Sequence, residues 1–295
     1  MKVIWVYENT KGVFSFYTKL NITLFVASVT LWKKYHPLHK TSLYADEMTI
    51  DIFNSLDILY LWDEVINLEY NDNIDRDIFW SGCKSKVLST MTEPCIIVDH
   101  DFLIFTNIDE HLKESVLYTH NDDMSIWYPK KEDINLKKLT NRVNFTQDLA
   151  ANVSLLYLPD PLFTKLYADR VIENHKQFTA MSNIQKNSQY LVFSEQYMLK
   201  EMLVEREITH KPLLQNVWSC ELNRALPTIQ QGVWTLAEST KKYKHYGPEK
   251  TYFYSNKAGF VYENVLSYLM RCISATKLMN VEYLAHNINK HISIR

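Results

Sequence analysis

Short apolar runs alternate with longer amphipathic segments along the first third of the chain. Residues 3–7, 41–45 and 65–68 are rich in β-branched and aromatic side chains, which predicts three strands. Residues 21–35 and 47–56 are predicted to form the helices that connect them. This order is typical of an α/β protein whose mostly parallel sheet is joined by right-handed crossovers.

A fourth apolar run ends in two carboxylates. After a helix predicted over residues 79–91, Cys95 to Val98 are all apolar, as in a central strand that is buried on both faces. Asp99 and Asp101 follow at once, at the end of the strand where open α/β sheets bind ligands. Two carboxylates on one turn can bind Mg²⁺ or Mn²⁺, and such an ion would bridge a diphosphate. The alternative is a polar strand exit in which the acids cap backbone amides.

The pattern changes after the acids, and the predicted elements become less regular. Strands are predicted at 115–119, 124–128 and 150–158, an exposed loop or helix at 130–142, and helices at 161–175, from Ser194 onward and at 256–279. Ser194 is the expected cap of its helix, with Glu195 in the first turn. Because no repeat or Pro/Gly/Ser-rich linker divides the chain, we expect residues 1–295 to form a single domain.

Composition excludes several classes of protein. A chain of 295 residues with 46% hydrophobic and 13% aromatic residues is globular. Only five glycines occur and no Gly-rich phosphate loop is present, so any bound phosphates must be held by metal and cationic side chains. The four cysteines are too widely spaced for a zinc site or a disulfide framework: Cys83, Cys95, Cys220 and Cys272.

The start of the chain and its longest apolar run bear on location. A strand is predicted from residue 3, which leaves no room for a signal peptide. The apolar run at residues 22–32 is too short to span a bilayer. Together with the cysteine usage, these features predict a cytoplasmic protein without a transmembrane segment.

Six short motifs occur in an order that resembles a known enzyme class. They are residues 43–46, Phe79-Trp80 with Lys84, residues 98–101, residues 150–152, Glu195-Gln196 and residues 244–250. This order resembles the GT-A class of nucleotide-sugar glycosyltransferases, and most of all small bacterial and phage relatives of the retaining family of glycogenin and the lipopolysaccharide galactosyltransferases. The resemblance implies a Rossmann-like GT-A fold in which residues 1–105 bind the nucleotide, and residues 106–295 bind the acceptor and end in helices.

The resemblance also implies a metal site. Asp99 and Asp101 look like the Asp-x-Asp motif, in which Asp101 binds Mn²⁺ or Mg²⁺ directly and Asp99 contacts the metal or the ribose. His245 is similar to the histidine that completes this metal shell, and imidazole is a reasonable Mn²⁺ ligand. Lys250 is placed like the lysine that holds the donor phosphates. The spacing His245-x-Gly247-x-x-Lys250 is one residue shorter than in glycogenin-like enzymes.

Further residues are candidates for the donor and acceptor. By resemblance, Lys84 reaches the donor phosphate or sugar, and three polar residues face the sugar and acceptor: Asn152, Glu195 and Gln196. Three residues at predicted strand ends are expected to hold the uracil and ribose: Tyr7, Tyr44 and Asp46. For each there is an ordinary structural alternative, namely a solvated lysine, a structural polar residue or a core tyrosine.

The two ends of the chain differ in charge. Residues 46–77 contain ten acidic residues and one arginine, whereas nine Lys and Arg face three Glu from Lys241 onward. A basic end beside the active site favours a polyanionic acceptor. Two acceptors fit, the phosphorylated core of a bacterial surface glycan and phage DNA with hydroxymethylated bases that receive glucose or arabinose. The alternative is a solvated helix that balances the acidic half.

The sequence therefore predicts a metal-dependent hexosyl- or pentosyltransferase that uses a UDP-sugar donor and a hydroxyl acceptor. The resemblance implies retention of the anomeric configuration, and no carboxylate in the sequence can be named as an inverting base. The competing class is a non-catalytic nucleotide-binding or interaction protein on the same scaffold.

Overall fold

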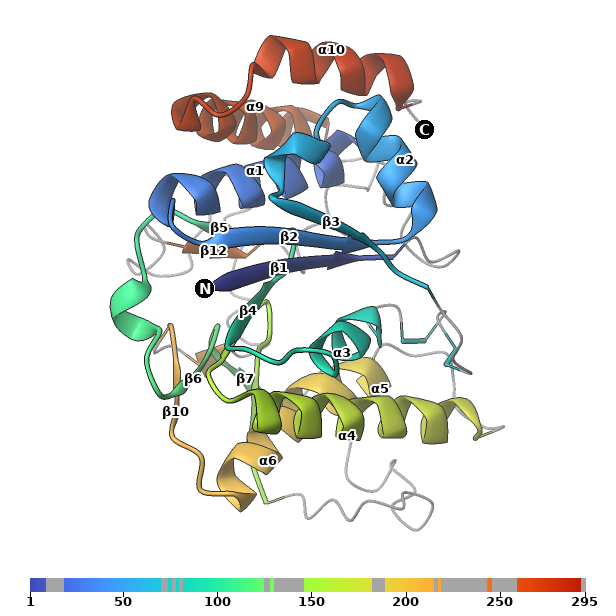
Figure 1. The fold of residues 1–295 in the computed structure, drawn as a ribbon, viewed down its shortest axis with the longest axis vertical. Helices are drawn as coiled ribbons and strands as arrows, with labels where there is room; N and C mark the ends of the chain where they lie inside the picture. Colours follow the sequence, from blue (N-terminus) through green and yellow to red (C-terminus); the bar gives the residue numbers. More distant parts are fainter. Residues whose placement is uncertain are drawn as a thin grey trace.

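A seven-stranded sheet runs through the computed structural model of the chain (Figure 1). The structure describes residues 1–8, 19–69, 74–75, 78–79, 82–124, 128–129, 146–181, 189–214, 217–218, 243–245 and 259–292. The strand order is β10-β6-β9-β4-β1-β2-β3. The strands span β1 Lys2–Tyr7, β2 Lys40–Ala45, β3 Glu64–Asn67, β4 Cys95–Val98, β6 Val116–Tyr118, β9 Leu155–Leu158 and β10 His210–Pro212.

The direction of the strands confirms the predicted α/β class with a mostly parallel sheet. All neighbours pair in parallel except β9, which is antiparallel to both β4 and β6. Strand β4 lies in the middle of the sheet, and all four of its residues are buried. A continuous apolar run is what a strand covered on both faces requires.

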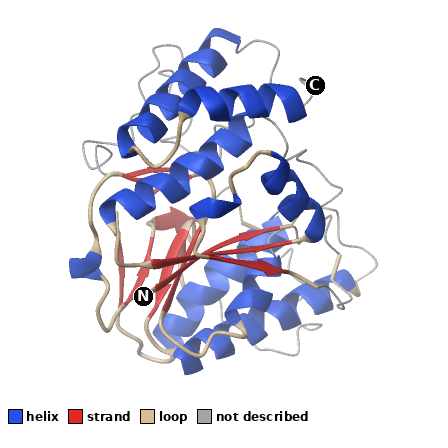
Figure 2. Ribbon diagram, turned by 45° about the horizontal axis from the view of Figure 1, so that its top comes forward, coloured by secondary structure: helices blue, strands red, loops and turns tan. Residues whose placement is uncertain are grey.

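Helices cover both faces of this sheet (Figure 2). On one side lie α1 Lys19–Tyr35, α2 Glu47–Ser55, α9 Gly259–Thr276 and α10 Val281–His291. On the other side lie α3 Gly82–Leu88, α4 Pro161–Thr179 and α6 Met198–Glu205. Strand β1 shows how the layers arise, because Val3 and Trp5 face the first group of helices and Ile4 faces the second.

Helix α1 contains the longest apolar run of the chain and is the innermost helix. Every residue from Leu20 to Trp32 is buried, because the sheet covers one side of the helix and α9 packs on another. It ends at Tyr35, just before His36-Pro37. Among the described residues, no helix is long and apolar enough to cross a membrane.

Two small sheets extend the carboxyl end of the large one. Strand β5 (Phe102–Ile104) pairs antiparallel with β12 (Tyr243–His245). Strand β7 (Asn121–Asp123) lies between β8 (Leu149–Ala151), which is antiparallel to it, and β11 (Val217–Trp218), which is parallel. Both small sheets therefore join segments that are far apart in the sequence.

Several predicted elements differ in the structure. The single strand expected at 150–158 is two strands, β8 and β9, in different sheets. Between them the Asn152 side-chain oxygen accepts from the Ser154 backbone N–H, 3.1 Å away, so the chain turns there. Residues 125–127 of the strand expected at 124–128 lie outside the described residues, and β7, which was not expected, precedes them. The helix expected at 79–91 is described only over α3.

The expected cap at Ser194 is also wrong, because this residue lies inside a helix. The helical run consists of α5 (Gln189–Val192), a π-helical segment η4 (Phe193–Tyr197) and α6. The Ser194 hydroxyl donates to the Tyr190 carbonyl at 2.8 Å, a bond one turn back along the helix. A serine that bonds backward in this way resembles a cap in sequence alone.

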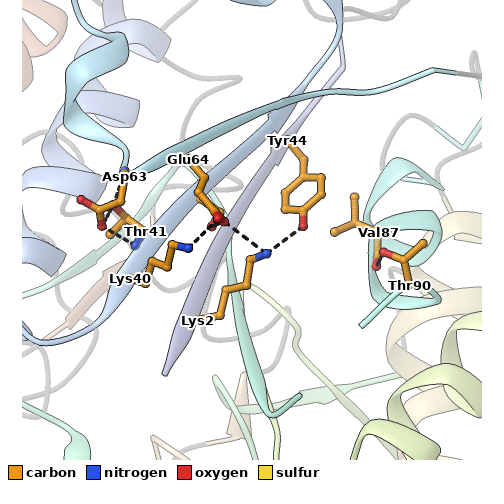
Figure 3. A network of polar contacts seen from close by, with 9 residues as sticks. Lys2, Lys40, Thr41, Tyr44, Asp63, Glu64, Val87 and Thr90 are labelled. Atoms are coloured by element: carbon orange, nitrogen blue, oxygen red, sulfur yellow. Dashed lines mark hydrogen bonds and ion pairs between the residues drawn. The ribbon is translucent and has the colours of Figure 1, made fainter. Parts of the chain in front are cut away.

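A polar network lies where β1, β2 and β3 begin (Figure 3). In this amino-end network, the Glu64 carboxylate accepts from Lys40 Nζ at 2.5 Å and from the Ser42 hydroxyl at 3.0 Å. Lys2 Nζ lies 3.4 Å from the same carboxylate and donates to the Tyr44 hydroxyl at 3.0 Å. These contacts tie the first residues of three strands together.

Candidate functional site

Asp99 and Asp101 lie on the turn between β4 and β5, which we call the acid turn. The Phe102 N–H donates to the Asp99 carbonyl at 3.0 Å, closing the turn, and the Asp99 N–H donates to the Ser154 carbonyl at 2.7 Å. From α1, the Ser28 hydroxyl donates to the Phe102 carbonyl at 2.9 Å. The backbone of the acid turn is thus fixed from two sides, while Asp101 is almost completely buried.

The middle residue of the acid turn packs against aromatic rings. His100 stacks on Phe25 with ring centroids 5.7 Å apart, and it meets Tyr7 edge to face at 6.0 Å. Tyr7, at the end of β1, therefore lies beside the residue between the two acids. Its role in holding a base stays a prediction.

Lys84 on α3 forms an ion pair with Asp99, and Glu195 adds a second negative charge nearby. We call these three residues the lysine cluster. Burial lowers the pKa of the Lys84 ammonium, but Asp99 and then Glu195 raise it by more, so the net shift is upward. Lys84 is therefore charged at all physiological pH values. The sequence predicted Lys84 and Asp99 as separate ligand-binding residues, and the structure places them in contact.

A small cavity with room for about one water molecule adjoins the lysine cluster. It is polar at Lys84 and Glu195, and apolar where it meets the core. Its other lining residues are Ser85, Leu88, Ile97, Val153, Leu156 and Tyr167. The Tyr167 hydroxyl donates to the Glu195 carbonyl at 3.0 Å, which anchors the helical segment that carries Glu195.

A second polar group, which we call the Asp122 cluster, surrounds a carboxylate at the middle of β7. His120 Nε2 lies 2.8 Å from Asp122 Oδ1, and Asn152 Nδ2 donates to Oδ2 at 3.2 Å. The Tyr128 hydroxyl lies 3.2 Å from Oδ2 and also donates to Gln196 Oε1. Three connecting segments, before β7, after β7 and between β8 and β9, thus converge on a single side chain.

The two clusters are adjacent. The segment from Asn152 to Ser154 belongs to both, because Asn152 binds Asp122 while the Ser154 carbonyl accepts from Asp99. The consecutive residues Glu195 and Gln196 also link the two clusters. Glu195 belongs to the lysine cluster, and Gln196 contacts Tyr128 of the Asp122 cluster. Both lie in the π-helical segment, a feature that is frequent at functional sites. The structure therefore brings together Lys84, Asp99, Asn152, Glu195 and Gln196, all predicted from the sequence.

Three members of the Asp122 cluster were not anticipated. His120, Asp122 and Tyr128 belong to no motif of the resemblance. A signal was present, because His120 and Asp122 follow the strand predicted at 115–119 and stand one residue apart, as Asp99 and Asp101 do after β4. Their importance depends on contacts with residues 152 and 196, which sequence spacing does not reveal.

The chemistry of the acid turn suits a divalent cation. Two carboxylates supply hard oxygen ligands, and β12 places residue 245 opposite Phe102, the next residue after Asp101. The predicted third ligand, His245, is thus beside the acid turn in register. Among the described side chains, no three His, Cys, Asp or Glu residues are grouped to hold a metal. Lys250 lies outside the described residues.

Two predicted nucleoside ligands have contacts within the protein. Asp46 caps α2 by accepting from the Thr49 N–H at 2.8 Å, and the Tyr44 hydroxyl accepts from Lys2 in the amino-end network. Tyr44 also packs among the buried residues between the sheet and α3. Their predicted contacts with uracil and ribose stay predictions.

No protein-family model matches the chain, and no curated protein matches it in sequence. Solved structures that the chain is similar to are glycosyltransferases, the class that its motifs resemble. One is GlyE of Streptococcus pneumoniae, with 11% identity over 99% of this chain and 64% of GlyE, at a TM-score of 0.48. Another is the galactosyltransferase LgtC in complex with donor and acceptor sugar analogues, with 9% identity over 97% of this chain and 99% of LgtC, at a TM-score of 0.48. The chain thus spans less than two thirds of the length of GlyE.

Proposed function

We propose that the protein is a metal-dependent glycosyltransferase that moves a sugar from a UDP-sugar to a hydroxyl acceptor. The observation that carries this proposal is the acid turn, whose two carboxylates lie at the carboxyl end of the sheet beside Lys84 and Glu195. Open α/β sheets bind ligands at this edge, and a nucleotide diphosphate needs a cation there. The motif resemblance points to the same class of enzyme.

In this proposal the acid turn and His245 hold a divalent ion. Mn²⁺ or Mg²⁺, when bound, offsets the charge that develops on the departing diphosphate. Asp101 and His245 are the direct ligands, and Asp99 contacts the ion or the ribose. Lys84 fixes the Asp99 side chain, and Lys250 holds the phosphates. A fixed cation near a leaving diphosphate stabilises it without reorganisation during the reaction.

The sugar is proposed to bind between the lysine cluster and the Asp122 cluster. Asp122 can accept hydrogen bonds from sugar hydroxyls, whereas Asn152 and Gln196 can donate to sugar oxygens. Positioning of this kind lowers the barrier because it supplies the orientation that free reactants lack. Retention of configuration is proposed from the resemblance.

The test is a titration of UDP against the protein with and without Mn²⁺, followed by assays of hydrolysis and transfer with several UDP-sugars. We expect UDP binding that depends on the metal, turnover of at least one UDP-sugar, and weaker thermal stabilisation by GDP and ADP. Metal-dependent binding with no turnover of any sugar would favour the non-catalytic nucleotide-binding protein. A preference for a purine nucleotide would contradict the uridine assignment.

The acceptor is proposed to be polyanionic. This rests on the basic residues from Lys241 onward, of which Arg271, Lys277 and Lys290 lie on or beside the described helices α9 and α10 and are exposed. A phosphorylated glycan and hydroxymethylated phage DNA both fit. Binding to duplex DNA that weakens steeply with salt favours DNA, and transfer to an oligosaccharide without DNA binding favours the glycan.

A further inference from the structure

We propose that Tyr128 is a positioning residue that fixes the side-chain amide of Gln196, so that Gln196 presents its nitrogen to the substrate. The inference rests on the proposed function, because it assigns a task to a residue of the same site. It concerns a tyrosine that no motif in the sequence singles out. Its basis is the hydrogen-bond geometry of the Asp122 cluster.

Tyr128 is placed to act as a rigid donor. Its side chain is 4% exposed, and the ring packs in a core cluster with Phe79, Ala150 and Phe193. Burial raises the pKa of the Tyr128 hydroxyl, and the neighbouring Asp122 carboxylate raises it further. The hydroxyl therefore keeps its proton over the physiological range and can always donate.

The single proton of Tyr128 faces two acceptors, Gln196 Oε1 at 2.5 Å and Asp122 Oδ2 at 3.2 Å. Asp122 has two other polar partners, His120 and Asn152, whereas the contact to Gln196 is the shorter one. We therefore assign the Tyr128 proton mainly to Gln196. This hydrogen bond from the phenol holds the amide oxygen of Gln196 against Tyr128, in the protein interior.

The consequence is the orientation of the Gln196 amide. The nitrogen of a primary amide lies on the other branch from its oxygen, so it points away from Tyr128 with two N–H donors. Gln196 is also half-buried, although Glu195 and Tyr197 on either side of it are buried. The amide therefore extends from the helix with its two N–H donors directed away from Tyr128. The substrate atom that faces Gln196 must then be an acceptor, such as a sugar hydroxyl or ring oxygen.

The π-helical segment makes this reach possible. The Met198 N–H is directed at the Phe193 carbonyl, five residues earlier, as well as at the Glu195 carbonyl. One extra residue in a turn rotates the side chains that follow relative to a continuous α-helix. Glu195 can then belong to the lysine cluster while Gln196 meets Tyr128.

The first experiment is Tyr128→Phe, which deletes one oxygen and keeps the buried ring. We expect kcat to fall by about 10- to 100-fold, because a poorly oriented group near the reacting atoms has an effect of this size. The KM for the UDP-sugar and the Kd for UDP should change by less than about threefold. The matched control is Tyr197→Phe, at the residue that follows Gln196 in the same helical segment. It removes a buried hydroxyl that donates to the Glu201 carboxylate at 2.8 Å. This control should lower the melting temperature and leave kcat within about twofold.

The second experiment is a double-mutant cycle with Gln196→Ala. If Tyr128 acts through Gln196, the double variant should be as slow as Gln196→Ala alone, within about twofold. Gln196→Glu keeps the amide oxygen and replaces the NH₂ group, with its two N–H donors, by a second oxygen, so we expect it to be as slow as Gln196→Ala. Gln196→Glu with at least half of the wild-type kcat would overturn the donor role of Gln196.

The outcomes separate this inference from the proposed function. An active wild-type protein whose kcat is unchanged by Tyr128→Phe, or multiplicative effects in the cycle, overturns the role of Tyr128 and leaves the glycosyltransferase function in place. A wild-type protein that turns over no UDP-sugar overturns the proposed function, and this inference falls with it. Circular dichroism of each variant, matching the wild type, ensures that a loss of kcat is not a loss of fold.

Discussion

The two polar networks at opposite ends of the sheet are built alike and differ in their charge balance. Each has a lysine between oxygen groups, Lys2 between Glu64 and Tyr44 at the amino end, and Lys84 near Asp99 and Glu195 at the carboxyl end. The exposed fractions of their side chains are similar. The side chains of Lys2 and Glu64 are 16% and 33% exposed, and those of Lys84 and Asp99 are 13% and 22% exposed.

Exposed surface therefore does not distinguish the amino-end network from the proposed site, whereas charge does. At the amino end two lysines, Lys2 and Lys40, share the one carboxylate of Glu64. At the carboxyl end the described site carries four carboxylates, Asp99, Asp101, Asp122 and Glu195, and its basic side chains are Lys84, His100 and His120. An excess of acid in a partly buried site favours the binding of a cation, because like charges close together are costly without one.

The largest expected effect comes from Asp101→Asn, which removes one charge at the acid turn and nearly preserves shape. We expect kcat/KM with a UDP-sugar to fall by about 1000-fold or more, equivalent to roughly 4 kcal/mol of transition-state stabilisation. Calorimetry should show that UDP binding no longer depends on Mn²⁺. The matched variant at the other end of the sheet, Glu64→Gln, should keep wild-type kcat/KM. Undiminished turnover by Asp101→Asn would contradict the assignment of the acid turn as a cation site needed for catalysis.

A somewhat smaller effect is expected from Lys84→Met. Without the ammonium, Asp99 and Glu195 repel each other and the acid turn loses its support, so kcat/KM should fall by about 100-fold. Lys84→Arg, which keeps the charge, should recover part of the loss. Lys2→Met is the control at the amino end, and its steady-state kinetics should match those of the wild type. Equal losses of activity in Lys84→Met and Lys2→Met would show that the lysine cluster contributes no more to catalysis than the amino-end network does.

The third prediction concerns acid stability and a histidine near the amino end. His36 follows α1, stacks on Trp32 with centroids 4.4 Å apart, and its Nε2 accepts from the Ile108 N–H at 3.0 Å. Burial lowers the pKa of His36 from 6.5 to about 4, and the partly opposing effect of Asp109 does not offset it. The unfolded chain thus binds more protons between these pH values, so folding stability is full above pH 6.5 and declines as the pH falls towards 4.

The expected decline in the free energy of unfolding is on the order of 2–3 kcal/mol, measured by urea denaturation from pH 7 to pH 4. His36→Gln has no imidazole to protonate, so its stability should change less over the same range. Parallel curves for the two proteins would show that His36 does not cause the decline.

The smallest effect is expected from Glu64→Gln. The Lys40 and Ser42 side chains lower the pKa of Glu64 from 4.5 to about 2, so its contribution is present above pH 4.5 and is lost as the pH falls towards 2. Solvent screens this partly exposed group, which limits the loss of stability in Glu64→Gln to about 0.5–1 kcal/mol at neutral pH. Thermal unfolding of both proteins from pH 7 to pH 2 measures it. A difference in stability that persists undiminished at pH 2 would contradict the assignment.

The parts of the site that could be predicted from the sequence are those set by local pattern. The apolar run before Asp99 identifies the buried strand, and the end of such a strand is where ligands bind. The placement of β12 beside the acid turn was implied only by the motif resemblance. Nothing in the local pattern of residues 243–245 indicates which strand they pair with.

The parts that could not be predicted depend on contacts between distant segments. Asp122 is recognisable only through His120, Tyr128, Asn152 and Gln196, whose positions span much of the middle of the chain. The break after Ala151 depends on one side-chain hydrogen bond, and the π-helical segment depends on one additional residue in a helical turn. Hydrophobic periodicity does not detect either of these features.

The pairing of β12 with β5 affects when this protein becomes complete during synthesis. Tyr243 of β12 lies opposite Ile104 of β5, the strand that follows the acid turn. Strand β12 therefore leaves the ribosome about 140 residues after β5 does. All seven strands of the central sheet lie before residue 213 and can form earlier. Because contacts between residues far apart in sequence close late and slowly, the nascent chain has its scaffold before it has its finished site. A ribosome-bound chain that ends before residue 243 should therefore fold its central sheet and still lack the strand that borders Asp101.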